Sequence, residues 1–376
     1  MLHRSYDNLA SHLEPGKVLV LYGPRQVGKT TLIKNMLNGI TERWRLESGD
    51  NILVHEVLSG LDFRKVLGFV EGLDLLVIDE AQRIPNIGMA LKIMVDEVPH
   101  LKILVTGSSS FELAGQVGEP LTGRKRTLTL YPMSLFELGS EKSPYELTRS
   151  LGEYLVYGMY PAVMTANGKD QKRRLLEELV GSYLLKDVLE LERIKSSKVL
   201  LDLLRLLAYQ IGSEVSPTEL GQKLALDGKT VARYLDLLEK AFVLYALRGY
   251  SGNLRKEIVR KGKYYFYDLG LRNTLISNLN PLEKRNDVGA LWENFMMMER
   301  LKSRAYREQH ANPYFWRTWD QSEIDLVEER DGCLHAYEFK WTEQQTAVPK
   351  DFIEAYPDSA FRTVHKGNWA DDFLLG

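Results

Sequence analysis

The stretch Val18-Leu-Val-Leu-Tyr-Gly-Pro-Arg-Gln-Val-Gly-Lys-Thr-Thr31 decides the fold of the N-terminal part of this chain. An apolar segment leads into the pattern G-x-x-x-x-G-K-[ST], and a helix-like segment, Thr31 to Leu37, follows directly. Glycines in such a loop let backbone N–H groups turn inward on phosphates at the N-terminus of a helix. We therefore predict a phosphate-binding loop between a buried strand and a helix.

Two side chains of this loop have distinct chemical roles. Lys29 reaches the β- and γ-phosphates of a bound nucleotide, and the hydroxyl of Thr30 is a ligand for Mg²⁺. The alternative is a glycine loop that binds no ligand. We expect the nucleotide to contact the whole loop, which comprises Gly23, Pro24, Arg25, Gln26, Val27, Gly28, Lys29, Thr30 and Thr31.

Acidic and hydroxyl residues end two later apolar segments, which read as buried parallel strands. The first leads into Asp79 and Glu80, and the second leads into Thr106 and Ser108. Beside a phosphate loop, Asp79 can hold the water shell of the metal, and Glu80 can orient and deprotonate an attacking water. Either Thr106 or Ser108 can sense the γ-phosphate, and the sequence leaves open both this choice and the alternative of a plain loop.

This arrangement resembles the AAA-type branch of the P-loop ATPases, over residues 1 to about 200. The resemblance implies ATP as nucleotide, hydrolysis of ATP, and an α/β fold with a parallel sheet and a helical lid. In such ATPases an arginine placed before the next strand is presented to the γ-phosphate in a neighbouring subunit, and Arg124 matches that place. A homo-oligomer is then expected; the alternative is a surface arginine. The expected strands are 18–22, 75–78, 103–105 and 127–131.

Residues 200–246 contain three helix-like pieces and a following apolar strand, an order typical of a winged helix-turn-helix. The second piece begins with Ser216, Pro217 and Glu219, which predict a capping box. A short glycine-containing turn precedes the third piece. The sequence therefore predicts a small helical module between the lid and the C-terminal region.

Basic residues on this module can neutralise phosphates of DNA or RNA. Tyr264 to Tyr267 lie beside them and form either a stacking platform for bases or a core strand. The third helix is also an ordinary amphipathic helix, so a joint or a protein-partner surface remains an alternative to nucleic-acid contact. The candidate contacts are Lys229, Thr230 and Arg233 in the third helix and Arg255, Lys256 and Arg260 in the wing region.

A hairpin near the C-terminus brings charged residues together. Asp331-Gly332 is the preferred dipeptide of a two-residue type I′ turn, which fixes the register of the two flanking strands. In that register Asp325 lies opposite Glu338, and Glu323 lies opposite Lys340, all on one face. Two facing carboxylates repel each other, and a bound divalent cation reverses the sign of that interaction.

An Asp followed by Glu-x-Lys resembles the restriction-endonuclease-like superfamily, whose PD-(D/E)xK cores often add an acid on the preceding helix. Glu293 matches that helix acid. The resemblance implies Glu293, Asp325, Glu338 and Lys340 as nuclease residues, with a second metal site on Asp325 and Glu338. The alternative is an inherited nuclease fold used as a scaffold, with a salt bridge between Glu323 and Lys340.

The whole chain resembles a group of prokaryotic ATPases that join an AAA module to a C-terminal domain of this kind. The motifs that carry this resemblance are Gly158-Met-Tyr-Pro161 and Lys263-Tyr-Tyr-Phe-Tyr-Asp-Leu-Gly270, besides those above. The expected organisation is an ATPase core at 1–135, a helical lid at 136–199, a winged helix at 200–275 and a restriction-endonuclease-like domain at 276–376.

Composition excludes several other classes of protein. The 376 residues include 49 Lys and Arg against 51 Asp and Glu, a net charge of −2, so the chain does not coat nucleic acid by bulk charge. A single cysteine, Cys333, makes no internal disulfide, and the histidines lack zinc-site spacing. No apolar run suffices to cross a membrane. We expect a cytoplasmic protein.

These features predict a Mg²⁺-dependent ATPase whose nucleotide cycle moves a C-terminal half that binds DNA or RNA. Whether that half is also a nuclease stays open at the level of the sequence. The alternative is a nucleotide-dependent switch or signalling ATPase with an inert nuclease-like fold that binds a protein partner. A nucleotide kinase is a third option, but Glu80 after Asp79 favours water as the acceptor.

Overall fold

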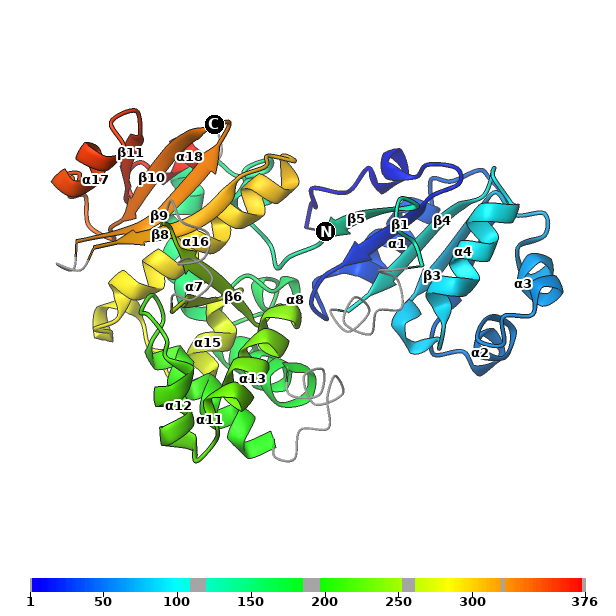
Figure 1. The fold of residues 1–376 in the computed structure, drawn as a ribbon, viewed down its shortest axis with the longest axis horizontal. Coiled ribbons are helices and arrows are strands. Elements are labelled where there is room, and N and C mark those ends of the chain that lie inside the picture. The colour runs from blue at the N-terminus through cyan, green and yellow to red at the C-terminus, as the bar shows by residue number, and fades with distance from the viewer. Residues whose placement is uncertain (1, 109–119, 185–196, 252–260, 319–321, 374–376) are drawn as a thin grey trace. The chain divides into compact units, whose positions relative to one another are not determined.

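The computed structural model describes residues 2–108, 120–184, 197–251, 261–318 and 322–373 (Figure 1). The chain divides into two compact units. The first unit comprises residues 1–132, 187–193 and 240–242, and the second comprises 133–186, 194–239 and 243–376. The helices expected as a lid on the ATPase core therefore belong, as far as they are described, to the second unit.

A parallel sheet forms the centre of the first unit. Across the described residues it has five strands in the order β2-β3-β4-β1-β5. β1 pairs in parallel with β4 and β5, and β3 pairs in parallel with β2 and β4. The strands span Val18–Tyr22 (β1), Trp44–Ser48 (β2), Leu75–Asp79 (β3), Lys102–Gly107 (β4) and Lys125–Thr129 (β5).

Helices flank this sheet (Figure 1). The apolar residues of β1, β3 and β4 are almost fully buried, as expected for parallel strands covered on both faces. The side chains of Asn51 and Asp62 cap α2 and α3 by accepting hydrogen bonds from backbone N–H groups. The helices span Lys29–Leu37 (α1), Ile52–Leu58 (α2), Phe63–Val70 (α3) and Ile87–Glu97 (α4), with single 3-10 turns at Leu9–His12 and Ala81–Arg83.

The second unit begins with helices α6 to α9 and continues with α11 to α13, the three pieces expected for the helix-turn-helix. At α12 the Ser216 hydroxyl accepts from the backbone N–H of Glu219, but the Glu219 carboxylate pairs with Lys223, so half of the expected capping box forms. The helices span Leu135–Leu138 (α6), Pro144–Tyr157 (α7), Pro161–Met164 (α8), Lys169–Glu178 (α9), Ser197–Tyr209 (α11), Pro217–Leu224 (α12) and Gly228–Lys240 (α13).

One mixed sheet joins the strands after α13 to those of the C-terminal region. In the part of the chain that is described, its order is β11-β10-β9-β8-β6-β7. β6 pairs with β7 in antiparallel and with β8 in parallel orientation, so the segment expected as a wing is continuous with the C-terminal sheet. The strands span Leu244–Gly249 (β6), Lys263–Phe266 (β7), Asn312–Arg317 (β8), Glu323–Arg330 (β9), Cys333–Phe339 (β10) and Ala360–Val364 (β11).

The remaining helices in the described part of the second unit are α15 to α18. Helix α16 is the helix expected before the hairpin. The π-helical turn Leu179–Leu184 follows α9, and a 3-10 turn lies at Leu282–Lys284. The helices span Leu269–Leu275 (α15), Val288–Tyr306 (α16), Lys350–Ala355 (α17) and Trp369–Phe373 (α18). None of the described helices is both long enough and apolar enough to cross a membrane.

The predicted hairpin register is confirmed. Cys333 pairs with Arg330, and the antiparallel pairing continues to Tyr337 opposite Leu326. The φ angles of Asp331-Gly332 are 50° and 79°, both positive, as a type I′ turn requires. A two-residue turn thus sets which residues of β9 and β10 face each other.

Two motifs separated by about a hundred residues meet in the second unit. Gly158, with φ of 71°, follows α7, and a Cβ there would lie 2.1 Å from an oxygen of the Asp268 carboxylate. Asp268 accepts a hydrogen bond from the backbone N–H of Met159 at 2.7 Å. A Cβ at Gly270 would lie 2.1 Å from the carbonyl oxygen of Tyr157. Both glycines are therefore required for α7 and α15 to approach each other this closely.

Candidate nucleotide site and carboxylate cluster

The glycine loop between β1 and α1 has the backbone that phosphate binding needs. Gly28 is the N-cap of α1 and has φ of 100°, a conformation that favours glycine. At Gly23, a Cβ would lie 2.0 Å from the carbonyl oxygen of Leu130, which follows β5. The loop can therefore turn at the carboxyl end of β1 only with glycine at both places.

Lys29 closes this loop on itself. It is 5% exposed, and its Nζ donates hydrogen bonds to the carbonyl oxygens of Gly23 at 2.7 Å and Pro24 at 2.9 Å. These carbonyls satisfy the ammonium group, so phosphate oxygens have to replace them for a nucleotide to bind to Lys29. The other predicted loop residues, which range from buried to exposed, are Val27, Arg25, Gln26 and Thr31.

The Asp79 carboxylate accepts hydrogen bonds from two hydroxyl groups. The Thr30 hydroxyl donates to Oδ2 of Asp79 at 2.7 Å, and the Thr106 hydroxyl donates to Oδ1. Thr106 also accepts the backbone N–H of Glu80 at 3.1 Å. Hydroxyl and carboxylate oxygens are the ligands that Mg²⁺ prefers, so Thr30 and Asp79 fit a magnesium ion bound together with phosphates.

Glu80 is held by a residue that the sequence analysis did not identify. Its φ is 53°, an uncommon conformation for a non-glycine residue, of the kind found at functional sites. The Gln82 amide donates to Oε2 of Glu80 and, at 3.2 Å, to the hydroxyl of buried Ser108. Gly49 lets the backbone approach, because a Cβ there would lie 2.1 Å from the carbonyl oxygen of Glu80. Thr106 is thus hydrogen-bonded to Asp79, and Ser108 is linked to Glu80 by the hydrogen bonds of the Gln82 amide.

A buried arginine from the N-terminal segment is hydrogen-bonded to the phosphate loop. Arg4 is 7% exposed, and its guanidinium donates to the carbonyl oxygens of Val27 and, at 2.7 Å, of Tyr131. It therefore ties the residue before Gly28 to the segment after β5. Nothing in the sequence around Arg4 marks it as a loop contact, because its partners lie far along the chain.

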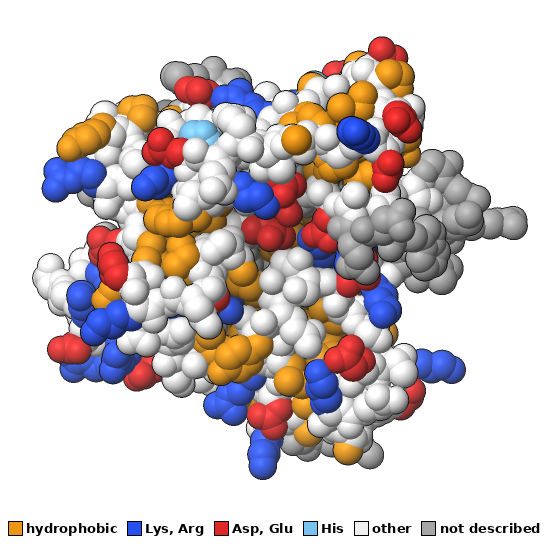
Figure 2. All heavy atoms as spheres, turned by 90° about the vertical axis from the view of Figure 1, so that its left-hand side faces the viewer, with side chains coloured by type: hydrophobic (Ala, Val, Ile, Leu, Met, Phe, Trp, Pro, Cys, Tyr) orange, Lys and Arg blue, Asp and Glu red, His pale blue; other side chains and the backbone are white. Residues whose placement is uncertain are grey.

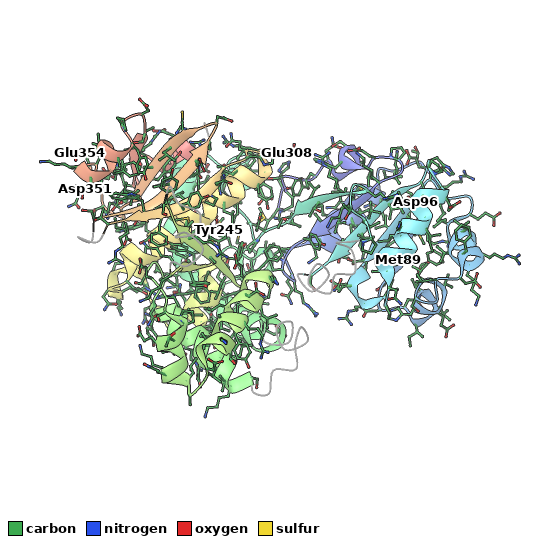
Figure 3. All side chains as sticks on the ribbon, viewed as in Figure 1. Met89, Asp96, Tyr245, Glu308, Asp351 and Glu354 are labelled. Carbon is green, nitrogen blue, oxygen red and sulfur yellow. The ribbon has the colours of Figure 1, made fainter. Side chains whose placement is uncertain are left out.

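Arg124, the candidate arginine finger, is partly exposed. Its Nε donates to Asp96 of α4 at 2.6 Å, and Figure 3 labels Asp96 on that helix. An exposed ion pair of this kind contributes little to stability and is exchanged readily. The assignment of Arg124 to a neighbour's γ-phosphate stays a prediction.

The four residues expected for a nuclease site come together in the second unit. Glu293 lies on α16, Asp325 on β9 and Glu338 on β10, and all three are largely buried. Lys340 donates to Glu338 at 2.6 Å. The Asp325 carboxylate accepts the backbone N–H of Phe339 at 2.8 Å. We call Glu293, Glu323, Asp325 and Glu338 the carboxylate cluster.

Lys263 of β7 lies in this cluster, and the sequence analysis did not place it there. It is 1% exposed; its Nζ lies 3.7 Å from Glu293 and donates to Glu323. The hydroxyl of Tyr265, two residues along β7, donates to Glu293 at 2.8 Å. The salt bridge between Glu323 and Lys340 that the scaffold alternative included does not form: Glu323 pairs with Lys263, and Lys340 pairs with its strand neighbour Glu338.

Burial and charge set the proton affinities of the cluster. Burial raises the pKa of Asp325 well above its ordinary value, and the carboxylates of Glu293 and Glu338 raise it further. Burial also raises the pKa of Glu293. Burial alone would lower the pKa of Lys263, but the carboxylates around it outweigh this effect and raise it. The surrounding carboxylates therefore favour the charged, ammonium form of Lys263.

The predicted second metal site on Asp325 and Glu338 stays a prediction. Among the described residues, no group of three or more His, Cys, Asp and Glu side chains is arranged to hold a metal ion. The ammonium group of Lys263 lies between Glu293 and Glu323 instead. Figure 2 shows acidic side chains gathered near the middle of one face, with basic side chains beside them.

The candidate nucleic-acid contacts on α13 lie in its first turns. Lys229 and Arg233 are exposed, and Thr230 is half-buried. Tyr265, Phe266 and Tyr267 are buried, in agreement with a core strand rather than a stacking platform. The wing contacts Arg255, Lys256 and Arg260 lie outside the described residues.

Three families match successive parts of the chain. Residues 15–139 match an AAA domain. Residues 148–283 match a domain of unknown function, DUF8612, and residues 288–369 match another, DUF4143. The first match contains the whole phosphate loop, Asp79 and Glu80, so the N-terminal part of the chain is an AAA-type, nucleotide-binding ATPase domain.

Relatives align over nearly the whole chain. Uncharacterized proteins of Mycobacterium tuberculosis and Mycobacterium bovis are each 31% identical over 345 residues, covering 89% of this chain and 72% of the relative. An uncharacterized protein of Methanocaldococcus jannaschii is 23% identical, covering 94% of this chain and 82% of the relative.

Two solved structures show a weak likeness. Domain III of the Thermotoga maritima replication initiation protein DnaA is 18% identical, with a TM-score of 0.29, over 50% of this chain and 87% of its own. A signal transduction ATPase with numerous domains from Pyrococcus horikoshii is 13% identical, also with a TM-score of 0.29, over 82% of this chain and 48% of its own. Such scores establish no shared fold. The extent and identity of the mycobacterial alignment do, however, establish a relationship: this chain, which carries an AAA domain at residues 15–139, belongs to the same family as the Mycobacterium tuberculosis protein.

Proposed function

We propose that the chain is a Mg²⁺-dependent ATPase in which Glu80 activates the attacking water. The observation that carries this proposal is the set of hydrogen bonds that joins Thr30, Asp79, Thr106 and the backbone of Glu80 beside the phosphate loop. Thr30 lies in the first turn of α1, Asp79 and Glu80 lie at the carboxyl end of β3, and Thr106 lies near the carboxyl end of the neighbouring β4. Bound Mg²⁺ supplies charge neutralisation on the phosphates.

The chain's own residues divide the remaining work. Backbone N–H groups of the glycine loop bind the phosphates, and Lys29 exchanges its two carbonyl partners for β- and γ-phosphate oxygens. The Glu80 carboxylate orients water and accepts its proton as the bond to the γ-phosphorus forms and ADP leaves. Ser108 and Thr106 lie near enough to Glu80 and Asp79 to report on the γ-phosphate.

The test is ATP binding and phosphate release measured for Lys29→Ala and Glu80→Gln. Lys29→Ala is expected to lose ATP binding, whereas Glu80→Gln binds ATP but hydrolyses it about 100- to 10,000-fold more slowly. Lys34→Ala, which removes an exposed lysine from the same helix, is the matched control. Full hydrolysis by Glu80→Gln would disprove the role of Glu80.

For the C-terminal half, the first proposal is nucleic-acid binding, controlled by the nucleotide cycle. It is supported by the exposed Lys229 and Arg233 on the first turns of α13. Each lysine or arginine that neutralises a DNA phosphate adds roughly one unit to the slope of binding against salt concentration. The Lys229→Ala/Arg233→Ala variant is therefore expected to bind duplex DNA more weakly, with a shallower salt slope. Lys240→Ala, at the other end of α13, should bind normally; unchanged binding by the double variant removes α13 from the interface.

A nuclease reaction at Glu293, Asp325, Glu338 and Lys340 is the further proposal that the sequence pattern supports. Labelled single-stranded and duplex DNA and RNA, incubated with Mg²⁺ or Mn²⁺ with and without ATP, test it. Cleavage that Asp325→Ala abolishes would establish a nuclease, and its response to Lys29→Ala would show whether nucleotide controls it.

The second candidate is a nucleotide-dependent switch that binds a protein partner through an inert nuclease-like fold. The position of Lys263 inside the carboxylate cluster favours this candidate. It predicts no cleavage in the same experiment while ATP hydrolysis continues. Capture of a protein partner that depends on ATP and is lost in Lys29→Ala would then identify the switch.

A further inference from the structure

Lys263 is surrounded by acidic groups from two other elements. Glu293 comes from α16 and Glu323 from the start of β9, and Asp325 follows two residues later on β9. All three carboxylates raise the pKa of Lys263. Nζ of Lys263 also lies over the ring of Phe315 on β8, 5.4 Å from its centroid, which is a cation–π contact.

The turn between α11 and α12 closes the same cluster from another side. Gly212 has φ of 73°, and a Cβ there would lie 2.9 Å from Oε1 of Glu293. Glu214 forms an isolated antiparallel bridge with Lys263. Arg317 lies 3.6 Å both from Glu214 and from Glu323. Charged groups of the helical segment and of the C-terminal sheet therefore form one connected set.

Electrostatics makes Lys263 and a divalent cation alternatives in this cluster. Buried carboxylates need a compensating positive charge, and removal of one partner of a buried ion pair is strongly destabilising. A divalent ion held by the same carboxylates would lie within a few ångströms of the ammonium group, where like charges repel strongly. Only one of the two cations can satisfy Glu293 and Glu323 at a time.

We infer that Lys263 is the resident cation of the carboxylate cluster, and that the cluster is a metal-free ionic joint between the α11–α12 turn, α16 and the sheet that contains β7 and β9. The residues that match a nuclease core then hold elements together instead of binding a metal. This inference does not depend on ATP hydrolysis at the phosphate loop. If the ionic joint is disproved, the proposed ATPase activity is unaffected, and the reverse also holds.

Manganese binding to the full-length protein tests the metal-free part. Mn²⁺ is titrated without nucleotide into the wild type and into Asp325→Asn, and free Mn²⁺ is followed by its electron paramagnetic resonance signal. The two proteins are expected to bind the same number of ions, since any ion at the nucleotide site is common to both. A stoichiometry that is lower by one in Asp325→Asn would overturn the inference.

Thermal unfolding tests the role of Lys263. In EDTA, Lys263→Met is expected to lower Tm by about 10 °C, because it leaves buried carboxylates without their cation. Added Mn²⁺ should raise the Tm of this variant and leave that of the wild type unchanged. Lys261→Met, which removes an exposed lysine from the same segment, is the matched control.

The conservative variant Lys263→Arg keeps the positive charge and covers the case in which Lys263→Met does not fold. It is expected to fold with a Tm between those of Lys263→Met and the wild type, without a response to Mn²⁺. A Tm of Lys263→Met equal to that of the wild type, or a Mn²⁺-dependent rise in the wild-type Tm that Asp325→Asn removes, would contradict the joint.

Discussion

At the scale of single residues, the candidate nucleotide site includes side chains that hold the predicted catalytic residues in place. Gln82 is such a residue, because its amide donates to both the Glu80 carboxylate and the Ser108 hydroxyl. The backbone of Glu80 lies in the left-handed region, which is uncommon for a non-glycine residue. The hydrogen bond from Gln82 therefore orients the carboxylate that we propose activates water.

Gln82→Ala is expected to lower kcat about tenfold or more while the KM for ATP stays the same. A hydrogen bond to a charged group contributes about 1.5–3 kcal/mol, and its loss affects the orientation of Glu80 rather than phosphate binding. Steady-state phosphate release over a range of ATP concentrations measures both constants. The neighbouring Arg83→Ala, which removes an exposed pair with Asp50, is the control. A raised KM at unchanged kcat would show that Gln82 acts on binding instead.

At the scale of elements, close backbone approach decides how helices meet. The contact of Gly158 with Asp268 leaves no space for a methyl group. Asp268 is buried, which raises its pKa, and it accepts backbone hydrogen bonds from Met159 and Leu271. The start of α15 is thus fixed against the end of α7 by one carboxylate.

Gly158→Ala is expected to destabilise the second unit by about 3 kcal/mol or more, since a Cβ forces the Asp268 carboxylate away from its partners and the positive φ adds strain. Urea unfolding followed by circular dichroism measures the change. Gly168→Ala also places alanine at a positive φ, of 83°, but in open space. The difference between the two variants therefore isolates the clash, and equal losses would mean that backbone strain alone matters.

The contact of Asp287 with Arg272 and Arg285 makes the stability of the fold depend on pH. Burial alone would raise the pKa of Asp287, but hydrogen bonds from Arg285 and Arg272 outweigh it and lower the pKa to about 2. The folded-state pKa lies below the unfolded value of 3.8, so this stabilisation is complete above about pH 4 and is lost as the pH falls from about 4 to about 2.

Asp287→Asn is expected to remove roughly 2 kcal/mol of stability at pH 7 and much less near pH 2. Urea unfolding of the wild type and the variant across pH 2 to 7 gives the free-energy difference at each pH. Other ion pairs titrate in the same way in both proteins, so their contributions cancel in this free-energy difference. A difference that stays constant from pH 7 to pH 2 would show that Asp287 stabilises by packing alone.

Prediction from sequence succeeded where a short stretch fixes its own geometry. The strand–loop–helix of 18–37 and the Asp331-Gly332 turn were both identified correctly, because the loop glycines and the turn dipeptide act locally. Arg4 and Lys263 were missed as site residues, since their partners lie 127 and 60 residues away. Gln82 stands two residues after Glu80, and its amide was a signal close enough in sequence to have been found.

At the scale of the whole molecule, the division into two units differs from the four segments expected from sequence. Residues 133–186 cluster with the C-terminal half, and β6 to β11 form one sheet. Composition and helical periodicity do not specify which elements pack together, because the apolar faces of different helices look alike in the sequence. Tertiary contacts such as that of Gly158 with Asp268 decide it.

Assembly is the other property at this scale. If Arg124 acts on a neighbour's nucleotide, Arg124→Ala should lower ATP turnover at concentrations where the wild type self-associates and have no effect on ATP affinity. Specific activity measured across a range of protein concentrations, beside sedimentation velocity, tests this. Arg126→Ala, which changes an arginine two residues later in the chain, within β5, is the control. Full turnover by self-associated Arg124→Ala would leave Arg124 as a surface partner of Asp96.

The N-terminus of α6 has a consequence for how the chain folds as it is synthesised. Its Leu135 N–H donates to the carboxylate of Glu299, and Lys302 donates to the carbonyl oxygen of Met133. These partners leave the ribosome more than 160 residues after the groups that they bind. The sheet of the first unit can form early, whereas these contacts can form only after α16 has been translated, so the α6 segment stays without them over most of the synthesis of the second unit.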